Sequence, residues 1–364
     1  MPNEQIRPNI GNIKPYTPGK PIEEVERELK ITGVVKLASN ENPLGPSPKA
    51  MEAIKKYSKD VSLYPDQSCY ELTGLLAEKL DMSPENIVIG NGSDEIMMLI
   101  ALAYISSGDE VIISLNTFST YETVSRLMEA SILNINLKDY TYDLQEMAAV
   151  ASQKTKLIFV CNPNNPTGTI NTKKDLDQLV SKVPANTIIV LDEAYSEYAE
   201  SQDFPDSLEY VRNNKNVIVL RTFSKIYGLA GLRVGYGIAR PDIIKYLRLV
   251  RLPFSVNRIG QIAASASLSD IHHVEVSRKN NSDGKKYLYG ELEKLGLSYV
   301  KTEANFIFID LKDDADAIFM KLMRHGVIVR PLSSFGMPGS IRVTIGTPDQ
   351  NNKFIKALSE VINK

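Results

Sequence analysis

A lysine near the middle of the chain lies where a buried strand is expected to end. Lys225 follows Ser224 in the segment RTFSKIYGLAGLRVGYGIA (221–239), directly before a glycine-rich stretch. The preceding apolar run NVIVL (216–220) is typical of a buried strand, and the glycines that follow allow close backbone approach. A solvated surface lysine needs no such setting, so Lys225 is a candidate nucleophile.

Polar and aromatic residues follow several other apolar runs in the same way. In open parallel sheets, ligands bind at the carboxyl ends of the strands, so the residues directly after each run are placed to do chemistry. These residues are NGSDE (91–95), LNTFSTY (115–121), CNPNNPTG (161–168), DEAY (192–195) and RTFSK (221–225). The spacing predicts that polar, ring-bearing and nucleophilic groups meet at one edge of a sheet.

Each of these segments, taken alone, also has a structural explanation. NGSDE fits a turn and a helix N-cap, although the N–H groups of Ser93 and Asp94 at a helix start can equally hold an anion. The Asn-Pro pairs of NPNNPTG make a rigid loop that presents Asn165. Asp192 lies at the end of a buried run, where an unpaired carboxylate is costly. It must therefore pair with a cation or a hydrogen-bond donor, or belong to a functional site. Tyr195, taken alone, fits the packing of a helix turn.

Taken together, these groups meet the requirements of pyridoxal 5'-phosphate. A lysine binds the aldehyde of this cofactor covalently, and a carboxylate against the pyridine nitrogen keeps the ring protonated and electron-withdrawing. An amide and a phenol can hold the ring oxygen, an aromatic side chain can stack on the ring, and an arginine with a hydroxyl can bind the phosphate. The candidates for these roles, in this order, are Lys225, Asp192, Asn165, Tyr195, Phe118, Arg233 and Ser224.

A regular alternation of strands and helices must position these residues. From about residue 86, apolar runs of strand length recur, most of them separated by amphipathic segments of helix length: NIVIG, EVIIS, SILNINL, KLIFV, TIIVL, NVIVL and RVGYGI. This pattern predicts an α/β fold in which a large domain, residues 41–255, has a mostly parallel seven-stranded sheet. Residues 256–364 are predicted to form a smaller α+β domain, and residues 1–40 an N-terminal arm that completes it.

Composition and charge exclude several classes of function. The chain has 364 residues with 42 basic and 44 acidic side chains, which leaves no electrostatic footprint for nucleic acid or an anionic membrane. No apolar run approaches the length of a membrane span, and the N-terminus lacks a signal-like segment, so we expect a cytoplasmic protein. Two cysteines without CxxC spacing and three histidines, two of them in a short HHVE cluster, make a metal site improbable.

The sequence resembles the fold-type I pyridoxal-phosphate aminotransferases. The resemblance is carried by NPNNPTG, by DEAY at a strand end and by SKIYGLAGLR, where S-K is followed by G-x-R at a fixed spacing. Within this family, further segments resemble those of the histidinol-phosphate aminotransferases in the same order, from about residue 12 to the end of the chain. They are PYTPGKPIEEV, KLASNENPLGPSPKA, LYPD, NGSDEI, CNPNNPTGT and IRVTIGT.

The resemblance implies a role for each residue at the cofactor. Lys225 would bind the cofactor and carry the proton of the substrate, and Asp192 would pair with the ring nitrogen. Tyr64, in LYPD, would reach the cofactor phosphate of a neighbouring subunit, which implies a homodimer. The other cofactor-binding positions are Ser93, Asp94, Phe118, Asn165, Tyr195, Ser224 and Arg233. The chain departs from the family at Asn116, where a proline is expected before the stacking segment.

The same resemblance implies substrate-binding positions in the small domain and the arm. Arg342 in SIRVTIGT matches a family arginine that grips a carboxylate, although an internal salt bridge is the structural alternative for it. Arg330 in VIVRP and Tyr16 in KPYTPGK match positions expected to hold the substrate phosphate. Asn40 is also assigned to the substrate site.

The implied reaction is the transfer of an amino group between L-histidinol phosphate and 2-oxoglutarate, a step of histidine biosynthesis. Two alternatives use the same lysine on the same scaffold: an aromatic amino acid aminotransferase and a threonine-phosphate decarboxylase. A non-catalytic regulator that keeps the fold is a third alternative. The sequence has no added helix-turn-helix domain and no basic patch to support the regulator.

Overall fold

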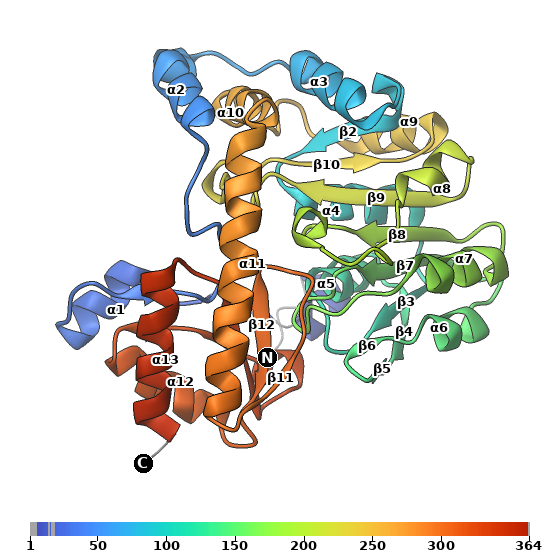
Figure 1. The fold of residues 1–364 in the computed structure, drawn as a ribbon. Helices are drawn as coiled ribbons and strands as arrows, with labels where there is room; N and C mark the ends of the chain where they lie inside the picture. Colours follow the sequence, from blue (N-terminus) through green and yellow to red (C-terminus); the bar gives the residue numbers. More distant parts are fainter. Residues whose placement is uncertain (1–5, 14, 16–18, 363–364) are drawn as a thin grey trace.

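A seven-stranded sheet forms the centre of the larger domain (Figure 1). The computed structural model describes residues 6–13, 15 and 19–362. The strand order is β2-β10-β9-β8-β7-β3-β4, and only β10 runs antiparallel to its neighbours. The strands are β2 (Ile87–Gly90), β3 (Glu110–Ser114), β4 (Ser131–Ile135), β7 (Thr155–Cys161), β8 (Ile188–Asp192), β9 (Val217–Thr222) and β10 (Gly235–Ile238). All seven apolar runs are strands, so the predicted mostly parallel sheet is confirmed.

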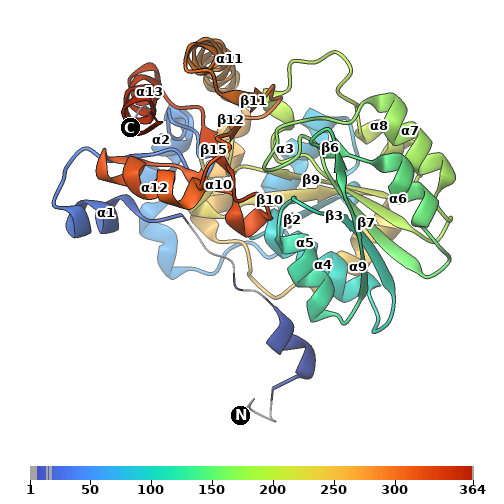
Figure 2. The ribbon, with the colours of Figure 1, turned by 90° about the horizontal axis from the view of Figure 1, so that it is seen from below.

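Helices cover both faces of this sheet. Figure 2 shows α4 (Ser93–Tyr104), α5 (Thr120–Leu127) and α9 (Pro241–Val250) on one side, and α6 (Leu144–Val150), α7 (Lys173–Lys182) and α8 (Leu208–Arg212) on the other. Because both faces are covered, the central strands are buried along their length, which explains why they occur in the sequence as continuous apolar runs. Short elements complete the domain: α2 (Pro48–Tyr57), η2 (Ser58–Ser62), α3 (Tyr70–Leu80), η3 (Pro84–Asn86), β5 (Leu137–Lys138), β6 (Thr141–Tyr142), η4 (Ser196–Tyr198) and η5 (Ala230–Leu232).

The smaller domain is built on a four-stranded antiparallel sheet with the order β11-β12-β15-β14. Its strands are β11 (Ser298–Val300), β12 (Phe306–Asp310), β14 (Arg330–Pro331) and β15 (Ser340–Thr344). The long helix α11 (Ile271–Lys294) runs from beside α10 (Arg258–Leu268) into this domain (Figure 1). The other helical elements are α12 (Ala315–Arg324), η6 (Ser333–Phe335) and α13 (Pro348–Ile362).

The N-terminal segment contacts both domains. Strand β1 (Val35–Lys36) pairs in parallel with β13 (Val327–Ile328), and α1 (Ile22–Leu29) packs beside it on the small domain. Before α1, the short helix η1 (Pro8–Asn12) lies against α5, where Asn9 donates a hydrogen bond of 2.9 Å to the carbonyl of Arg126. The described parts of the segment thus contact both domains, and its role as an arm stays a prediction.

The boundary between the domains was predicted after residue 255. Val256 and the α10 residues Ala263, Ala264 and Leu268 pack into the hydrophobic core of the seven-stranded sheet, and Leu288 of α11 packs into the core of the small domain. α10 therefore packs with the larger domain. The exact position of the domain boundary stays a prediction.

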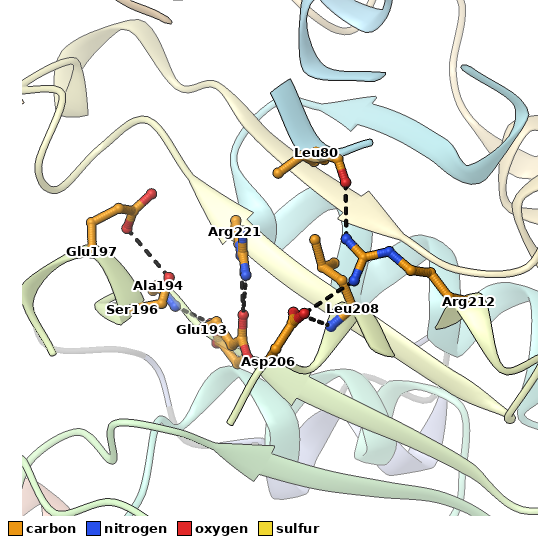
Figure 3. A network of polar contacts seen from close by, with 10 residues as sticks. Leu80, Glu193, Ala194, Ser196, Glu197, Asp206, Leu208, Arg212 and Arg221 are labelled. Atoms are coloured by element: carbon orange, nitrogen blue, oxygen red, sulfur yellow. Dashed lines mark hydrogen bonds and ion pairs between the residues drawn. The ribbon is translucent and has the colours of Figure 1, made fainter. Parts of the chain in front are cut away.

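A buried ion pair ties β9 to the segment after β8 (Figure 3). The Arg221 guanidinium donates from Nε and Nη2 to Glu193 Oε2 at 3.0 and 2.8 Å, and the Glu193 side chain is almost fully buried. Glu193 directly follows Asp192, the last residue of β8. The pair therefore fixes the chain next to the strand ends from which the candidate site is built. In the described part of the chain, no helix is long and apolar enough to cross a membrane.

Candidate active site

A cavity of about 240 Å³ lies at the carboxyl ends of β7, β8 and β9, between the two domains. Twelve of the predicted site residues line this cavity. They are Asn40, Ser93, Asp94, Phe118, Asn165, Asp192, Tyr195, Ser224, Lys225, Arg233, Arg330 and Arg342. The large domain supplies most of them, and the two arginines at 330 and 342 come from the small domain.

Lys225 lies just beyond β9, and its Nζ donates a hydrogen bond of 3.2 Å to the carbonyl of Ser39. Its Nζ also lies 5.5 Å from the centre of the Tyr195 ring. Burial, helped by the positive charge of Arg342, lowers the pKa of Lys225 to about 8. A substantial fraction of the amine is therefore neutral, and nucleophilic, slightly above neutral pH.

Asp192 ends β8, where it is flanked in register by Cys161 of β7 and Leu220 of β9. Its side chain is buried, and each carboxylate oxygen accepts one hydrogen bond. Tyr121 donates to Oδ2 at 2.7 Å, and the N–H of Ala194 donates to Oδ1 at 3.1 Å. Burial raises the pKa of Asp192 to about 6, and the two hydrogen bonds oppose this rise.

An anion cradle lies at the N-terminus of α4. The first N–H groups of a helix have no partner within the helix, and here they belong to Ser93 and Asp94. Arg233 reaches the same place, with Nη2 3.1 Å from Asp94 Oδ2 and Nη1 3.4 Å from Ser224 Oγ. A Cβ atom at Gly92 would lie only 2.6 Å from Arg233 Nη2, so glycine is required for this approach.

Amide and phenol groups also line the cavity. Asn40 Nδ2 donates to the hydroxyl of Tyr195 at 3.0 Å, and both residues are buried. Arg342 Nη1 donates to Asn165 Oδ1, and its Nη2 donates to the carbonyl of Ala38 at 2.6 Å. Arg342 thereby links the small domain to the loop that follows β7.

Two arginines lie directly opposite each other in the small domain. Arg330 of β14 pairs in register with Arg342 of β15, and both are more than nine-tenths buried. Arg330 Nη2 donates to Ser334 Oγ at 3.4 Å, and its guanidinium lies 5.8 Å from the Phe335 ring centre. Both guanidinium groups line the cavity, and an arginine can pair with a phosphate or a carboxylate through two parallel hydrogen bonds.

One described residue of the predicted site does not line this cavity. Tyr64 is 79% exposed, lies at a separate hollow on the surface and stacks on Phe254 with 4.7 Å between ring centres. Tyr16 lies outside the described residues.

The cavity also contains residues that sequence reasoning did not select. Ser39, Glu41, Cys161, Thr222 and Phe335 line it, and Tyr121 lies directly behind it, bonded to Asp192. A signal for Tyr121 was present, because it belongs, like Phe118, to the segment LNTFSTY (115–121) that directly follows the apolar run EVIIS. Nothing local identified Phe335, which comes to the cavity only through the packing of η6.

The residues of the cavity fit pyridoxal 5'-phosphate. An amine, a buried carboxylate, a half-buried aromatic ring, a helix N-terminus and an arginine all line the same cavity. These are the groups that a nucleophile, a ring partner and a phosphate cradle for this cofactor require. Among the described residues, no three His, Cys, Asp or Glu side chains are grouped so that they could hold a metal ion.

Comparison with known families agrees with this geometry. A family model described as aminotransferase class I and II matches residues 32–358. A histidinol-phosphate aminotransferase of Moorella thermoacetica is 53% identical over 98% of this chain and 93% of the relative. A second, from Caldicellulosiruptor saccharolyticus, is 48% identical over 98% of this chain and 100% of the relative.

Solved structures show the same fold. The histidinol-phosphate aminotransferase of Sinorhizobium meliloti, in complex with pyridoxal-5'-phosphate, superposes with a TM-score of 0.90 and 28% identity. The alignment covers 99% of this chain and 98% of that chain. The aspartate aminotransferase of Thermotoga maritima has a TM-score of 0.85 at 21% identity and covers 99% of this chain and 100% of that chain. The predicted fold-type I architecture is therefore confirmed.

Proposed function

This chain belongs to the aminotransferase class I and II family, and from that premise we propose that it transfers an amino group from L-histidinol phosphate to 2-oxoglutarate. The products are imidazole acetol phosphate and L-glutamate, in a step of histidine biosynthesis. The enzyme is an aminotransferase that depends on pyridoxal 5'-phosphate. The choice of substrate is supported by the two relatives named above. Both are histidinol-phosphate aminotransferases, and each matches this chain over nearly its whole length.

The observation that carries the proposal is the pair of opposed arginines at the cavity. L-Histidinol phosphate has a phosphate but no carboxylate, whereas glutamate and 2-oxoglutarate have two carboxylates. An aminotransferase must bind both kinds of molecule in turn at one site. Arg330 and Arg342, held in register on β14 and β15, offer two planar guanidinium groups that can pair with either a phosphate or a carboxylate.

Different residues of the chain would contact different parts of the cofactor. When bound, pyridoxal phosphate supplies an aldehyde that takes up the amino group and a ring that withdraws electrons from the substrate. Asp192 would hold the ring nitrogen, Phe118 would lie against the ring, and the cradle at the start of α4 would hold the phosphate. Asn165 and Tyr195 would hold the ring oxygen.

Lys225 is proposed to move the proton. Its Nζ takes the proton from the substrate carbon that carries the amino group. Because its pKa is lowered to about 8, the amine can accept and release that proton near neutral pH. The arginines orient the substrate by its anionic groups so that this carbon is presented to Lys225.

A single half-reaction tests the proposed substrate. The purified enzyme, loaded with pyridoxal phosphate, is mixed separately with L-histidinol phosphate, phenylalanine and threonine phosphate, and the absorbance spectrum and products are followed. We expect the fastest conversion to the pyridoxamine form with L-histidinol phosphate. Faster conversion with phenylalanine would make the protein an aromatic aminotransferase, and release of carbon dioxide from threonine phosphate would make it a decarboxylase.

The Arg330→Ala variant tests the anion site in the same assay. Because loss of a charge-assisted hydrogen bond costs about 1.5–3 kcal/mol, the dissociation constant of L-histidinol phosphate should rise roughly 10- to 100-fold. That of phenylalanine, which has no phosphate, should change less. Arg324→Ala, an exposed arginine at the end of α12, is the matched control. An equal loss of affinity for both substrates would show that Arg330 stabilises the domain and does not bind the phosphate.

We further propose that the protein is a cytoplasmic homodimer. An exposed apolar surface surrounds Tyr64, and the residues that form it are Val61, Leu63, Tyr64 and Phe254, which line one hollow and are each at least 44% exposed. Apolar side chains gathered in this way are typical of a surface that a protein partner covers. Size-exclusion chromatography with light scattering would give the mass of the particle, and a monomer at micromolar concentration would contradict the proposal.

A further inference from the structure

Tyr121 contacts the carboxylate that would hold the cofactor ring. Its side chain is completely buried, and its hydroxyl donates a hydrogen bond of 2.7 Å to Asp192 Oδ2. The N–H of Ala194 occupies the other oxygen at 3.1 Å. These two donors, one from α5 and one from the turn after β8, therefore determine the orientation of the carboxylate.

The ring of Tyr121 is itself held on both sides. It stacks on Phe159 of β7, with 4.9 Å between ring centres and 12° between planes. On another side it meets the edge of Phe118, at 5.7 Å and 82°. Tyr121 thus contacts the residue proposed to lie against the cofactor ring and the residue proposed to hold its nitrogen. Its packing leaves the hydroxyl aimed at Asp192.

The charge of Asp192 depends on the groups that face it from every neighbouring element. Burial disfavours the ionised carboxylate, and Asp94 at the start of α4 disfavours it further, whereas Lys225 and the two hydrogen-bond donors favour it. The titratable groups around it are Tyr121, Cys161, Tyr142, Tyr195, Asp94 and Lys225. Among these groups, Tyr121 is the one whose hydrogen bond acts most strongly on the pKa of Asp192.

We propose that Tyr121 is a positioning residue for the cofactor: its hydroxyl keeps Asp192 ionised and oriented toward the ring nitrogen. The proposal rests on the dependence on pyridoxal phosphate and not on which amino donor the enzyme uses. Tyr121 does not react with the substrate, and it acts through Asp192. Its loss should therefore weaken cofactor binding and slow the proton transfer, with little effect on the binding of the amino donor.

The test compares Tyr121→Phe with Tyr210→Phe. Tyr210 is a matched control because it is also buried and its hydroxyl also donates to an aspartate, Asp177, at 2.8 Å, on α8 away from the cavity. The dissociation constant of pyridoxal phosphate is measured by spectrophotometric titration from pH 6 to pH 8.5. We expect it to rise about tenfold in Tyr121→Phe near pH 7, the loss of one hydrogen bond to a charged group, and to stay unchanged in Tyr210→Phe.

The pH dependence of the cofactor dissociation constant shows whether Tyr121 positions Asp192 or has only a structural role. Without the hydroxyl, Asp192 takes up a proton at a higher pH, so the ratio of variant to wild-type dissociation constants should widen as the pH falls from 8.5 to 6. In steady-state assays, kcat should fall while KM for the amino donor changes little. A ratio that is constant with pH, or an equal effect of Tyr210→Phe, would overturn the proposal.

A double-mutant cycle keeps the proposal testable if Tyr121→Phe also weakens folding. In an Asp192→Asn background, adding Tyr121→Phe should change the cofactor dissociation constant by less than about twofold, because the carboxylate is already absent. A full tenfold loss in that background would show that Tyr121 acts by packing alone. The kcat comparison uses whichever amino donor the wild-type enzyme converts, so failure of L-histidinol phosphate as a substrate would leave this test intact.

Discussion

Burial changes the pKa values of the two central residues in opposite directions. It lowers the pKa of Lys225 to about 8 and raises that of Asp192 to about 6, because both groups lose water around their charged forms. At pH 7 to 8, Asp192 is therefore largely ionised while part of Lys225 is neutral. The same buried environment thus makes Lys225 available as a base and leaves Asp192 as an anionic ring partner at the same pH.

Keeping Asp192 ionised should cost stability in the cofactor-free protein. The ordinary pKa of Asp192 is near 3.8, and the folded value is about 6, so the folded state binds more protons between these pH values. Its contribution to stability is therefore present at low pH and is lost as the pH rises toward 6. Asp192→Asn removes this loss and should stabilise the cofactor-free protein by about 1–3 kcal/mol at pH 7.5.

Denaturant unfolding of cofactor-free wild type and Asp192→Asn at pH 5 and pH 7.5 measures this effect. The gain in the variant should be larger at pH 7.5 than at pH 5. The loaded variant should nevertheless be much slower, because the ring loses its anionic partner. A variant that is less stable than the wild type at pH 7.5 would show that the ionised carboxylate stabilises the cofactor-free fold.

At the scale of elements, the loop before α5 carries the departure from the family pattern. Asn116 has a φ angle of 56°, and its Nδ2 donates to the carbonyl of Phe335 in η6. Proline, which is restricted to φ near −65°, cannot adopt this conformation. The loop is therefore held by a side-chain bond to the small domain where the family pattern has a rigid proline.

The variants Asn116→Pro and Asn116→Gly separate the contribution of the positive φ angle from that of the hydrogen bond to Phe335. Glycine accepts the positive φ and loses only the hydrogen bond, so it should cost about 1 kcal/mol of unfolding free energy. Proline also forces a different backbone and should cost about 2–4 kcal/mol. Denaturant unfolding compares the two variants, and a proline variant as stable as the glycine variant would show that the loop rearranges freely.

The Arg221–Glu193 pair joins β9 to the segment that follows β8 (Figure 3). Glu193→Ala leaves the Arg221 guanidinium largely buried without its carboxylate and should cost about 3–5 kcal/mol. Replacing both members, with Glu193→Leu and Arg221→Met, should recover most of that loss, because an apolar pair avoids the desolvation cost. Unfolding free energies of the three variants test this, and a double variant no more stable than Glu193→Ala would contradict it.

At the scale of the whole molecule, the cavity is formed by two domains and, on our proposal, completed by a second subunit. Arg330 and Arg342 reach it only because the small domain packs over the strand ends. Tyr64 remains on the exposed surface of its own chain. The proposed dimer would give this residue a function in the site of the partner subunit.

Mixed subunits test the shared site. Lys225→Ala and Tyr64→Ala homodimers should each be nearly inactive, the first without its nucleophile and the second with weakened cofactor binding. Mixing and exchanging the subunits should restore activity, since a hybrid dimer has one site with both Lys225 and a Tyr64 from its partner. Activity after mixing is measured against each homodimer alone, and no recovery despite demonstrated subunit exchange would place Tyr64 outside the site.

The sequence by itself determined the elements and the residues that end them. Buried parallel strands require continuous apolar runs, and polar residues begin where each strand leaves the core. The runs that end before Asp192 and Lys225 therefore identified two strands of the sheet. They also identified the edge of the sheet at which the candidate site lies. The start of α4 at Ser93 could also be predicted locally, because the glycine turn at Gly92 that precedes it depends only on neighbouring residues.

Only the tertiary structure decided which side chains meet across distant segments. The hydrogen bond from Tyr121 to Asp192, the contact of Asn116 with Phe335 and the opposition of Arg330 and Arg342 join residues from separate elements. The helix that contains Tyr121 could be read from local pattern, but the direction of its hydroxyl follows from packing against Phe159. Such contacts depend on the registers and crossing of whole elements, which local spacing does not specify.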